Sequence, residues 1–307
     1  MQLVTVPKIA DRPEADLVVL PFWQGSKKAE PACSLAPFKS ELEPILQADD
    51  FKGKEEETVL IYTGKKKESR LLLLGCGKKS ETSPETFRKA VAPVVKLCRQ
   101  KGWSTLNIVC PEEGSYHVPI TEGVLLSNYV YERLKHDTLK EGTESSLKKL
   151  CLIGSYKNQD KECKRAQTII EAVNFARDLI NGNADDITPQ KLSETAHDLC
   201  KTSSSLKATI LGKKEIIKAG LGLLLAVNRA SFRDPALIIV EYRGNPSSKD
   251  CTAIIGKGIT YDTGGLILKP RGSMETMKDD MSGGAAVLGT LKAAAALKLP
   301  VNIIGII

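Results

Sequence analysis

The chain has 307 residues, of which 42% are hydrophobic and 26% are charged, and its formal net charge is +7. This composition is typical of a globular protein with a sizeable core, and the length suits two domains. The longest apolar runs, such as Leu221–Val227, are too short to cross a bilayer, and the amino terminus lacks the charged-then-apolar pattern of a signal peptide. We therefore expect a soluble, cytoplasmic protein.

The basic residues and the eight cysteines indicate no special partner. The lysines form clusters such as Lys65–Lys67 and Lys78–Lys79, without the aromatic residues that accompany them on nucleic-acid-binding surfaces. A solvated face is the favoured interpretation, and nucleic-acid binding is the alternative.

No Cys-x-x-Cys pair occurs, so we expect reduced thiols that pack like small apolar side chains. Six cysteines stand in or beside apolar or helical stretches: Cys76, Cys98, Cys110, Cys151, Cys200 and Cys251.

Strand-like and helix-like segments alternate through the first half of the chain. Ser83 and Pro84 predict the cap and first position of a helix that continues through Phe87–Lys101, and another helix is expected over Ile120–Leu134. Short apolar runs bounded by polar residues predict the strands. This alternation predicts a mostly parallel sheet with helices on both faces. The expected strands are 16–23, 58–63, 70–76, 106–110 and 150–154.

A polar, charged stretch at 155–164 separates a second region of the same α/β type. Apolar residues at three- and four-residue spacing predict a long amphipathic helix over Cys163–Ile180, and Thr188 with Pro189 predicts the start of another helix. The expected organisation is an amino-terminal domain at 1–157, a linker helix at 158–182 and a second domain at 183–307, again a mostly parallel sheet flanked by helices. Strands are expected at 206–211, 236–242, 252–256 and 301–307, with 236–242 and 252–256 buried, and helices at 213–219 and 284–297.

Ionisable residues concentrate after the strand at 252–256, and open α/β sheets bind their ligands at the carboxyl ends of strands. Gly256-Lys257-Gly258 fails as a phosphate-binding Walker A loop, because Cys251 stands where its first glycine belongs. It fails as a dinucleotide fingerprint because Tyr261 replaces the third glycine. The stretch 75–80 (GCGKKS) also lacks the third glycine, so a plain turn is favoured there. A nucleotide-binding protein is therefore disfavoured.

The alternative for this segment is a metal site. Asp262 in a loop and Asp280 at the start of a helix can converge on one divalent ion, and carboxylate oxygens suit magnesium or manganese as well as zinc. Each aspartate alone is more often a capping residue than a ligand, and nearby lysines serve as ion-pair partners as readily as oxyanion stabilisers. Met274, Met277 and Met281 are interpreted as core filler or as the lining of an apolar pocket.

The segment GKGITYDTGGLILKPRGSMETMKDDMSGGAAV at 256–287 closely resembles the signature of the leucine aminopeptidase (cytosol aminopeptidase) family of two-metal exopeptidases. The stretches 176–189, 221–231 and 236–244 continue the likeness, and the first half is compatible with the variable first domain of that family. The resemblance implies hydrolysis of the amino-terminal peptide bond, with leucine and other apolar first residues preferred. It also implies two divalent ions in the complete site: manganese or zinc, with magnesium as a third candidate.

The resemblance implies a role for five residues. Lys257 corresponds to a metal ligand, which must be neutral to bind a cation, and Asp262 to the carboxylate that bridges both metals. Asp280 corresponds to a ligand of the second metal, so that the adjacent aspartate at 279 is a neighbour only. Lys269 corresponds to the catalytic lysine that polarises the scissile carbonyl, and Met277 to the pocket for the first side chain of the substrate.

The resemblance further implies a homo-hexamer, in which the first domain serves regulation or assembly. A second family motif, Asn-Thr-Asp-Ala-Glu-Gly-Arg, supplies further carboxylates and a catalytic arginine downstream of the strand that ends at Ile307, and it occurs nowhere in this chain. We therefore expect a truncated catalytic domain and a 307-residue chain that is inactive alone. The alternative is a non-catalytic binding protein, with a protein or DNA partner, built on a truncated aminopeptidase.

Overall fold

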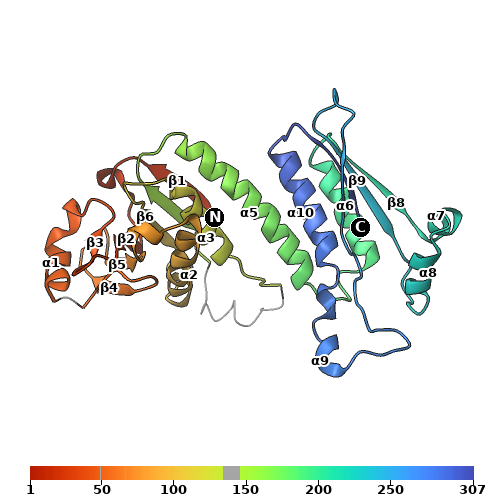
Figure 1. The fold of residues 1–307 in the computed structure, drawn as a ribbon, viewed down its shortest axis with the longest axis horizontal. Coiled ribbons are helices and arrows are strands. Elements are labelled where there is room, and N and C mark those ends of the chain that lie inside the picture. Colours follow the sequence, from red (N-terminus) through yellow and green to blue (C-terminus); the bar gives the residue numbers. More distant parts are fainter. Residues whose placement is uncertain (49, 66, 134–145) are drawn as a thin grey trace. The chain divides into compact units, whose positions relative to one another are not determined.

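The computed structural model describes residues 1–48, 50–65, 67–133 and 146–307. They form two compact units, unit 1 (Met1–Ile170) and unit 2 (Glu171–Ile307). Each unit has its own sheet and its own apolar core (Figure 1). The expected α/β class with two sheets is therefore confirmed. No helix in the described residues is long and apolar enough to cross a membrane.

The sheet of unit 1 has the strand order β1-β7-β6-β2-β5-β4, with β3 paired to β2. Four of its pairings are parallel, and only β4 and β3 run antiparallel to their neighbours, as the sequence predicts for a mostly parallel sheet. The short strands β1 and β3 were not predicted. The strands are β1 (Gln2–Val6), β2 (Leu17–Trp23), β3 (Glu30–Pro31), β4 (Thr58–Tyr62), β5 (Arg70–Gly75), β6 (Thr105–Val109) and β7 (Lys149–Ile153).

Strand β2 lies at the centre of unit 1 and is buried along its whole length. Leu17 and Val19 pack into one apolar cluster, whereas Val18 and Leu20 pack into another. Because alternate side chains of a strand point to opposite faces, both faces of this sheet are covered. The helices of unit 1 are α1 (Lys39–Ala48), α2 (Pro84–Gln100) and α3 (His117–Ser127), and its 3-10 turns are η1 (Ile9–Asp11), η2 (Ala36–Phe38) and η3 (Lys79–Glu81).

Local capping determines where the helices of unit 1 begin and end. Helix α2 starts as predicted, because the Ser83 hydroxyl accepts the Thr86 N–H and the Thr86 hydroxyl accepts the Ser83 N–H. Helix α3 ends at Ser127, earlier than the predicted Ile120–Leu134, because the Asn128 side chain bonds both backbone groups of Leu147 instead. Leu134 itself lies outside the described residues.

All eight cysteines are free thiols, as expected. Burial raises the pKa of Cys33, Cys76 and Cys98 to about 12, so these thiols stay protonated and unreactive near neutral pH. The prediction that Cys251 packs like an apolar side chain is wrong, because this residue is exposed beside β10.

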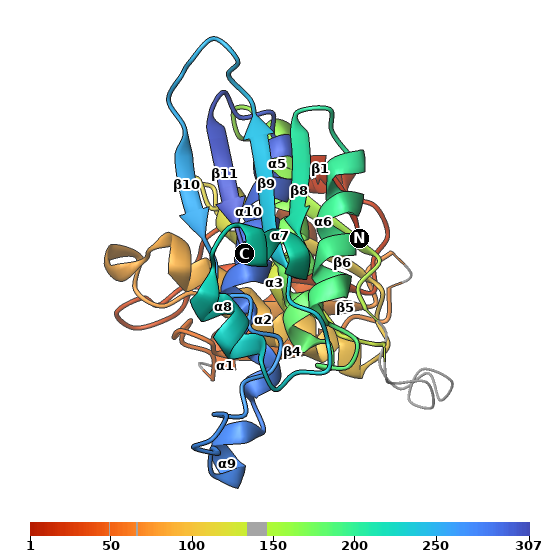
Figure 2. The same cartoon turned by 90° about the vertical axis from the view of Figure 1, so that its right-hand side faces the viewer.

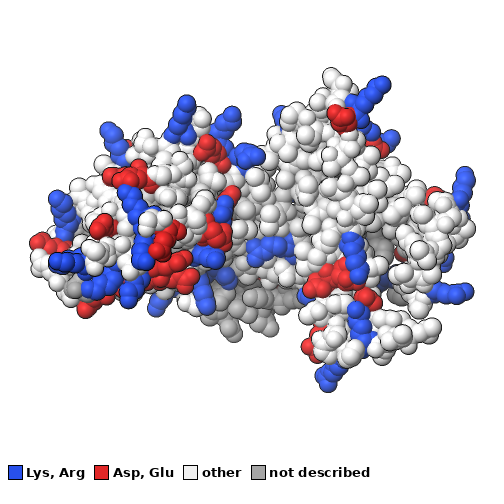
Figure 3. Space-filling model, in the orientation of Figure 1, with Lys and Arg blue, Asp and Glu red and all other residues white. Residues whose placement is uncertain are grey.

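Charged side chains of both signs are mixed over the surface of unit 1, as the left half of Figure 3 shows for the face in view. Several lysines and arginines have a carboxylate partner, for example Lys78 with Glu81 at 2.9 Å. A solvated, charge-balanced face is therefore favoured over a basic nucleic-acid-binding surface for unit 1.

A single helix, α5 (Gln159–Asn181), spans the boundary between the units. It begins four residues before the predicted Cys163–Ile180 and ends next to Gly182. Its carboxyl-terminal half belongs to unit 2, where the backbone at Ala172 lies against Gly289 of α10. A β-carbon at Gly289 would approach the Ala172 carbonyl oxygen to 3.0 Å, so the glycine permits this close helix packing.

The sheet of unit 2 has the order β10-β11-β9-β8, seen face-on in Figure 2. Strands β10 and β11 are parallel, but β11–β9 and β9–β8 are antiparallel, so the prediction of a mostly parallel sheet is wrong for unit 2. The chain between β8 and β9 forms only two short helices, which do not cross the sheet, and it therefore re-enters at the end where it left. The strands are β8 (Leu206–Leu211), β9 (Leu237–Arg243), β10 (Thr252–Ile255) and β11 (Asn302–Ile306).

One face of this sheet carries the core of unit 2. Ile238 and Val240 of β9 join an apolar cluster with Leu288 and Leu291 of α10, and Thr188 caps α6 by accepting the Lys191 N–H, as predicted. The helices of unit 2 are α6 (Pro189–Lys201), α7 (Lys213–Lys218), α8 (Gly222–Asn228), α9 (Arg271–Met274) and α10 (Ser282–Ala296), with the 3-10 turn η4 (Met277–Asp279).

The prediction that β10 is buried is wrong. It is an edge strand in which Ile255 is 79% exposed, and Thr252 and Ala253 are also exposed. Only Ile254 packs toward the core cluster. A short apolar run occurs in central strands and in edge strands alike. The sequence pattern therefore does not reveal that β10 lies at the edge of the sheet.

The ionisation of Asp16 tests whether its hydrogen bonds contribute to the stability of unit 1. Partial burial opposes its ionisation, but its carboxylate accepts hydrogen bonds from the Thr105 hydroxyl and from the Thr105 and Ser104 N–H groups, which lower its pKa. The pKa of Asp16 is lower in the folded protein than in the unfolded one. The stabilisation that these hydrogen bonds give is therefore complete above the unfolded-state pKa of ~3.9, and it is lost as the pH falls through the folded-state pKa.

We expect Asp16→Asn to lower the free energy of unfolding by about 1–2 kcal/mol at pH 7, since three bonds lose a charged acceptor. Urea unfolding across pH 2–7 measures this, and the difference from the unmodified protein shrinks toward the acid end. The exposed Asp11→Asn serves as the control and changes little. A difference for Asp16→Asn that is constant with pH would contradict the ionic origin.

Candidate metal centre

The four ionisable residues singled out in the sequence all lie in the connection between β10 and α10, at the carboxyl end of β10. This connection folds back so that its beginning touches the start of α10. A β-carbon on Gly256 would lie 2.3 Å from the Gly283 carbonyl oxygen, so only glycine fits there. The Gly284 N–H then donates to the Lys257 carbonyl at 2.8 Å. Two segments far apart in the loop are thereby joined.

The fold-back places Lys257 beside Asp280. The Lys257 Nζ lies 3.0 Å from the Asp280 Oδ1, and the aspartate side chain is only 16% exposed. The other oxygen, Asp280 Oδ2, is buried and has no hydrogen-bond partner among the described residues. A buried carboxylate oxygen without a donor is costly unless a cation balances it.

A second pair lies in the middle of the loop. The Lys269 Nζ is 3.1 Å from the Asp262 Oδ2, and the Asp262 Oδ1 accepts the Gly264 N–H at 2.8 Å. Gly264 has a φ of 87°, a conformation that favours glycine, and it turns the chain so that the Lys269 N–H reaches the Thr263 carbonyl. The Gly264 N–H and then the Lys269 ammonium lower the pKa of Asp262, so this carboxylate is ionised near neutral pH.

The competing interpretation of the two aspartates as capping residues holds only in part. Asp262 does accept a backbone N–H in a turn. The Asp280 side chain caps no helix: Met281 occupies the N-cap position of α10, and Asp280 closes η4 only through its backbone N–H. Asp279 is exposed, and the bonds found for it are made by its backbone: its N–H donates to the Thr276 carbonyl, and its carbonyl accepts the Ser282 hydroxyl. Of the neighbouring acids at 279 and 280, Asp280 is therefore the one directed at the site.

The three methionines have different surroundings. Met281 is fully buried in the core of unit 2, as a core filler would be. Met274 and Met277 are half-buried, in α9 and in η4 respectively. The role of Met277 in a substrate pocket stays a prediction.

Two contacts that hold the loop in place were missed by sequence reasoning. The Lys278 Nζ donates to the Asn181 carbonyl at the end of α5, at 3.0 Å, and the Tyr261 hydroxyl donates to the Met274 carbonyl at 3.1 Å. Both bonds end on backbone carbonyls, which every residue has, so no side-chain spacing indicates them.

These residues supply some, but not all, of the ligands that a divalent cation needs. Asp280 Oδ2 is a buried acceptor without a partner, and Asp262 supplies a second ionised carboxylate in the same loop. Yet no group of three or more His, Cys, Asp or Glu side chains suited to a metal occurs in the described residues. Divalent ions in proteins take four to eight ligands, so these residues make up part of a site.

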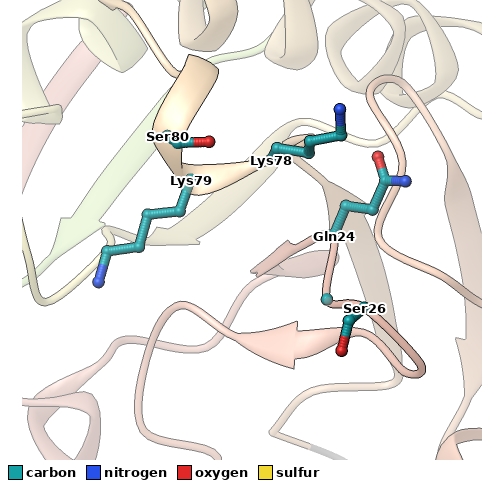
Figure 4. Close-up of a pocket in the computed structure, with 6 residues that line it drawn as sticks. Gln24, Ser26, Lys78, Lys79 and Ser80 are labelled. Atoms are coloured by element: carbon teal, nitrogen blue, oxygen red, sulfur yellow. The ribbon is translucent and has the colours of Figure 1, made fainter.

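The other glycine-rich stretch, at 75–80, lies beside a surface pocket of unit 1 (Figure 4). The pocket is lined by Gln24, Gly25, Ser26, Lys78, Lys79 and Ser80. Both lysines already have carboxylate partners, Glu81 for Lys78 and Glu113 for Lys79. The stretch itself runs into the one-turn η3, and α2 begins only after it, at Pro84, so the interpretation as a plain turn is favoured over a phosphate site.

The paired carboxylates and amines follow a strand of an α/β unit, the position at which open α/β sheets bind ligands. Sequence comparison is more specific. Residues 19–138 match the amino-terminal domain of the cytosol aminopeptidase family, and residues 174–307 match its catalytic domain. The chain is 47% identical over 312 aligned residues to a probable cytosol aminopeptidase of Protochlamydia amoebophila and 42% identical to one of Chlamydia felis. The chain belongs to the cytosol aminopeptidase family.

Solved structures agree with this assignment. The bottromycin maturation enzyme BotP in complex with Mn is 25% identical, with a TM-score of 0.77 over 95% of this chain and 58% of that one. A mutant of tomato leucine aminopeptidase has the same fold, with a TM-score of 0.82 over the whole of this chain and 62% of that one, at 23% identity. The alignments cover 100% and 96% of this chain but only 62% and 60% of the two chlamydial relatives.

Gly256 provides a test of the fold-back. We expect Gly256→Ala to destabilise unit 2 by about 1–3 kcal/mol, because the added methyl group collides with backbone rather than with a movable side chain. Gly272→Ala is the matched control, since nothing lies within 4 Å of its β-carbon position. Thermal unfolding of both variants measures the difference, and equal melting temperatures would show that the approach of Gly256 to Gly283 is not a constraint.

Proposed function

We propose that this chain forms the amino-terminal domain and part of the catalytic domain of a metal-dependent aminopeptidase, which removes leucine and other apolar amino-terminal residues from peptides. The observation that carries the proposal is the pairing of Lys257 with Asp280, at 3.0 Å, around a buried carboxylate oxygen without a partner. Membership of the cytosol aminopeptidase family supports it. Divalent ions bound there would supply Lewis acidity and an activated water to peptide hydrolysis.

Four residues of this chain have proposed roles at the ions. Asp280 would hold an ion through its unpartnered Oδ2, and Asp262, which is ionised near neutral pH, would supply a second carboxylate. Lys257 could hold an ion through its Nζ only as a neutral amine, so a metal bound there would displace a proton to solvent and would replace the ion pair with Asp280. Lys269 would supply the cation that polarises the carbonyl of the substrate, once a metal ion takes its place beside Asp262.

Met277 is proposed to line the pocket for the first side chain of the substrate. It lies in η4, three residues before Asp280, and it is half-buried, so a thioether surface is available close to the metal ligand. A flexible, polarisable side chain suits aliphatic first residues of different shape, which supports a preference for leucine and other apolar residues.

Manganese or zinc, with magnesium as a third candidate, are the proposed ions, two in each complete site. Carboxylate ligands bind all three, and the solved relative BotP was determined with Mn. We also propose a homo-hexamer in the cytoplasm, active in peptide turnover, with unit 1 serving regulation or assembly. The names of the chlamydial relatives as cytosol aminopeptidases support this location.

A non-catalytic binding protein with a protein or DNA partner is the weaker proposal. Against DNA, the basic residues of unit 1 alternate with acidic ones on the face shown in Figure 3, and Lys78 and Lys79 are neutralised by carboxylates. Binding to duplex DNA that weakens steeply between about 50 and 200 mM salt would favour this alternative.

We expect the 307-residue chain alone to be inactive. Its described residues hold no group of three acidic, His or Cys side chains suited to a metal, and it contains no second carboxylate and arginine motif. The measurement is the release of the chromophore from a leucine chromogenic amide with added manganese. Robust turnover by this chain, at a rate proportional to its concentration and abolished by a chelator, would overturn the prediction.

Lys269 is tested in a chimaera that joins the carboxyl-terminal part of the Protochlamydia relative to this chain. We expect Lys269→Gln to lower kcat by about 10²–10³-fold with a small effect on KM, because the cation acts on charge that develops in the transition state. Arg271→Gln removes an exposed cation from the same loop and is the matched control. Equal kcat values for the two variants would show that Lys269 has no catalytic role.

A further inference from the structure

Three parallel strands of unit 1 end together at one edge of its sheet. Val6 of β1 and Val109 of β6 are both register partners of Ile153 in β7. The Gly154 N–H donates to the Val6 carbonyl at 2.9 Å. The Cys110 N–H donates to the Ile153 carbonyl at 2.8 Å, so the pairing continues to the last residue of each strand. Unit 1 therefore has the carboxyl-terminal edge at which open α/β sheets bind ligands.

A cavity of about 410 Å³ lies at this edge, where the start of α5 lies next to β1 (Figure 1). We call it the helix cavity, because residues 159–161 in the first turn of α5 are part of its lining. A second cavity of about 360 Å³, which we call the apolar cavity, has four lining residues in common with the first: Pro7, Gly154, Ser155 and Tyr156. The two cavities are therefore neighbours along the same edge.

The Gln159 side chain lines the helix cavity and has a donor without an acceptor. Gln159 is only 7% exposed, and its Nε2 has no hydrogen-bond partner among the described residues. A buried amide nitrogen without an acceptor costs free energy. A ligand oxygen bound in the cavity would remove this cost.

The start of α5 adds backbone donors to the helix cavity. In the described residues the N–H groups of Asp160 and Lys161 have no acceptor, since only the flanking Gln159 and Glu162 N–H groups bond to the preceding turn. Helix α5 has 23 residues, and the positive end of its dipole lies here. Free N–H groups at the positive end of a long helix favour an oxyanion.

The charged side chains of this lining are compatible with an anion. Asp160 is an acid, but its Oδ1 accepts the Thr5 hydroxyl and its Oδ2 lies 4.0 Å from the Lys164 Nζ. Its charge is therefore directed at groups of the protein. Lys161 is exposed in the same lining and supplies a cation.

Tyr156 forms a wall that the two cavities share. Its ring stacks on the His117 ring with the centroids 4.6 Å apart, and its hydroxyl donates to the Pro111 carbonyl. The His117 Nε2 lies 2.7 Å from the Glu162 Oε2 in the first turns of α5. Contacts within unit 1 thus hold the wall and the donors of α5 in place before any ligand binds.

The apolar cavity has an uncharged floor of three aliphatic side chains and two thiols: Ile9, Val109, Ile153, Cys33 and Cys110. Burial raises the pKa of both thiols, so they are neutral near neutral pH. Lys8 and Glu112, one of each sign, are exposed at the rim. A cavity of this size and lining suits a small ring or a short aliphatic group.

We propose that unit 1 binds a small organic phosphate. Its phosphate oxygens accept hydrogen bonds from the Gln159 Nε2 and from the Asp160 and Lys161 N–H groups, and its apolar body fills the apolar cavity. A phosphate group suits the helix cavity better than a carboxylate, because it has three acceptor oxygens for three donors. The site lies wholly in unit 1, whereas the candidate metal centre lies in unit 2, so the proposal does not rest on the proposed function.

The test is calorimetric titration of the metal-depleted 307-residue protein, in which no bound ion recruits phosphate. We expect phenyl phosphate to bind at least about tenfold more tightly than inorganic phosphate, because the ring buries apolar surface. Benzyl alcohol, which has the ring without the charge, is expected to bind at least about tenfold more weakly than phenyl phosphate. Equal affinity of phenyl phosphate and either of these probes would overturn the proposal, as would tighter binding of phenylacetate.

Amide resonances locate the bound phosphate. Phenyl phosphate is expected to shift the N–H resonances of residues 159–161, whose donors it engages. Shifts confined to residues 78–80, at the lysine cluster next to the other pocket of unit 1, would show that the probe binds a basic surface, and the proposal would then be wrong.

Two variants examine the Gln159 donor. Gln159→Glu keeps the shape of the side chain but replaces the donating group with an acid, and we expect it to weaken the binding of phenyl phosphate at least about tenfold. Gln190→Glu is the matched control, because it makes the same change at an exposed residue in the first turn of α6. Equal affinities of the two variants would contradict the role of Gln159.

Gln159→Leu covers the case in which a buried acid unfolds unit 1. It removes an amide that has no partner for its Nε2, so we expect the melting temperature of the free protein to be kept and the affinity for phenyl phosphate to fall. A leucine variant that folds and binds phenyl phosphate as tightly as the unmodified protein overturns the proposal.

Discussion

The close approach of Gly256 to Gly283 is the constraint on which the candidate site depends. It joins the end of β10 to the start of α10, so that the Gly284 N–H reaches the Lys257 carbonyl and the Lys257 ammonium reaches Asp280. The remaining part of the loop then closes as a separate turn around Gly264. Because these glycines carry no side chain, two Lys–Asp ion pairs lie in one loop.

Local signals in the sequence predicted much of the fold. Ser83 and Thr188 cap the helices that they were expected to cap, because capping involves only neighbouring backbone groups. Pairing direction and burial depend on distant partners. The apolar run of β10 therefore gave no sign that Ile255 is exposed, and the segment at 206–242 gave no sign that β8 and β9 are antiparallel. Asn128 likewise ended α3 through a contact with Leu147 that spacing along the chain does not reveal.

The candidate site was predictable in its members and not in its arrangement. Lys257, Asp262, Lys269 and Asp280 stand out through their motif, and the structure brings them together in two pairs. Which lysine meets which aspartate depends on the fold-back, a tertiary feature. The motif also does not reveal that Asp280, lying between η4 and α10, has one buried oxygen with no hydrogen-bond partner among the described residues.

The edge position of β10 also bears on the order in which unit 2 folds. The only neighbour of β10 in the described residues is β11, which follows α10 in the chain, and parallel pairing across a helix requires closure of a long loop. During synthesis the loop that carries the two Lys–Asp pairs therefore leaves the ribosome well before the strand that anchors it. We therefore expect the Lys257–Asp280 contact to form only after β11 has paired with β10, because that pairing fixes the end of the strand from which Lys257 follows.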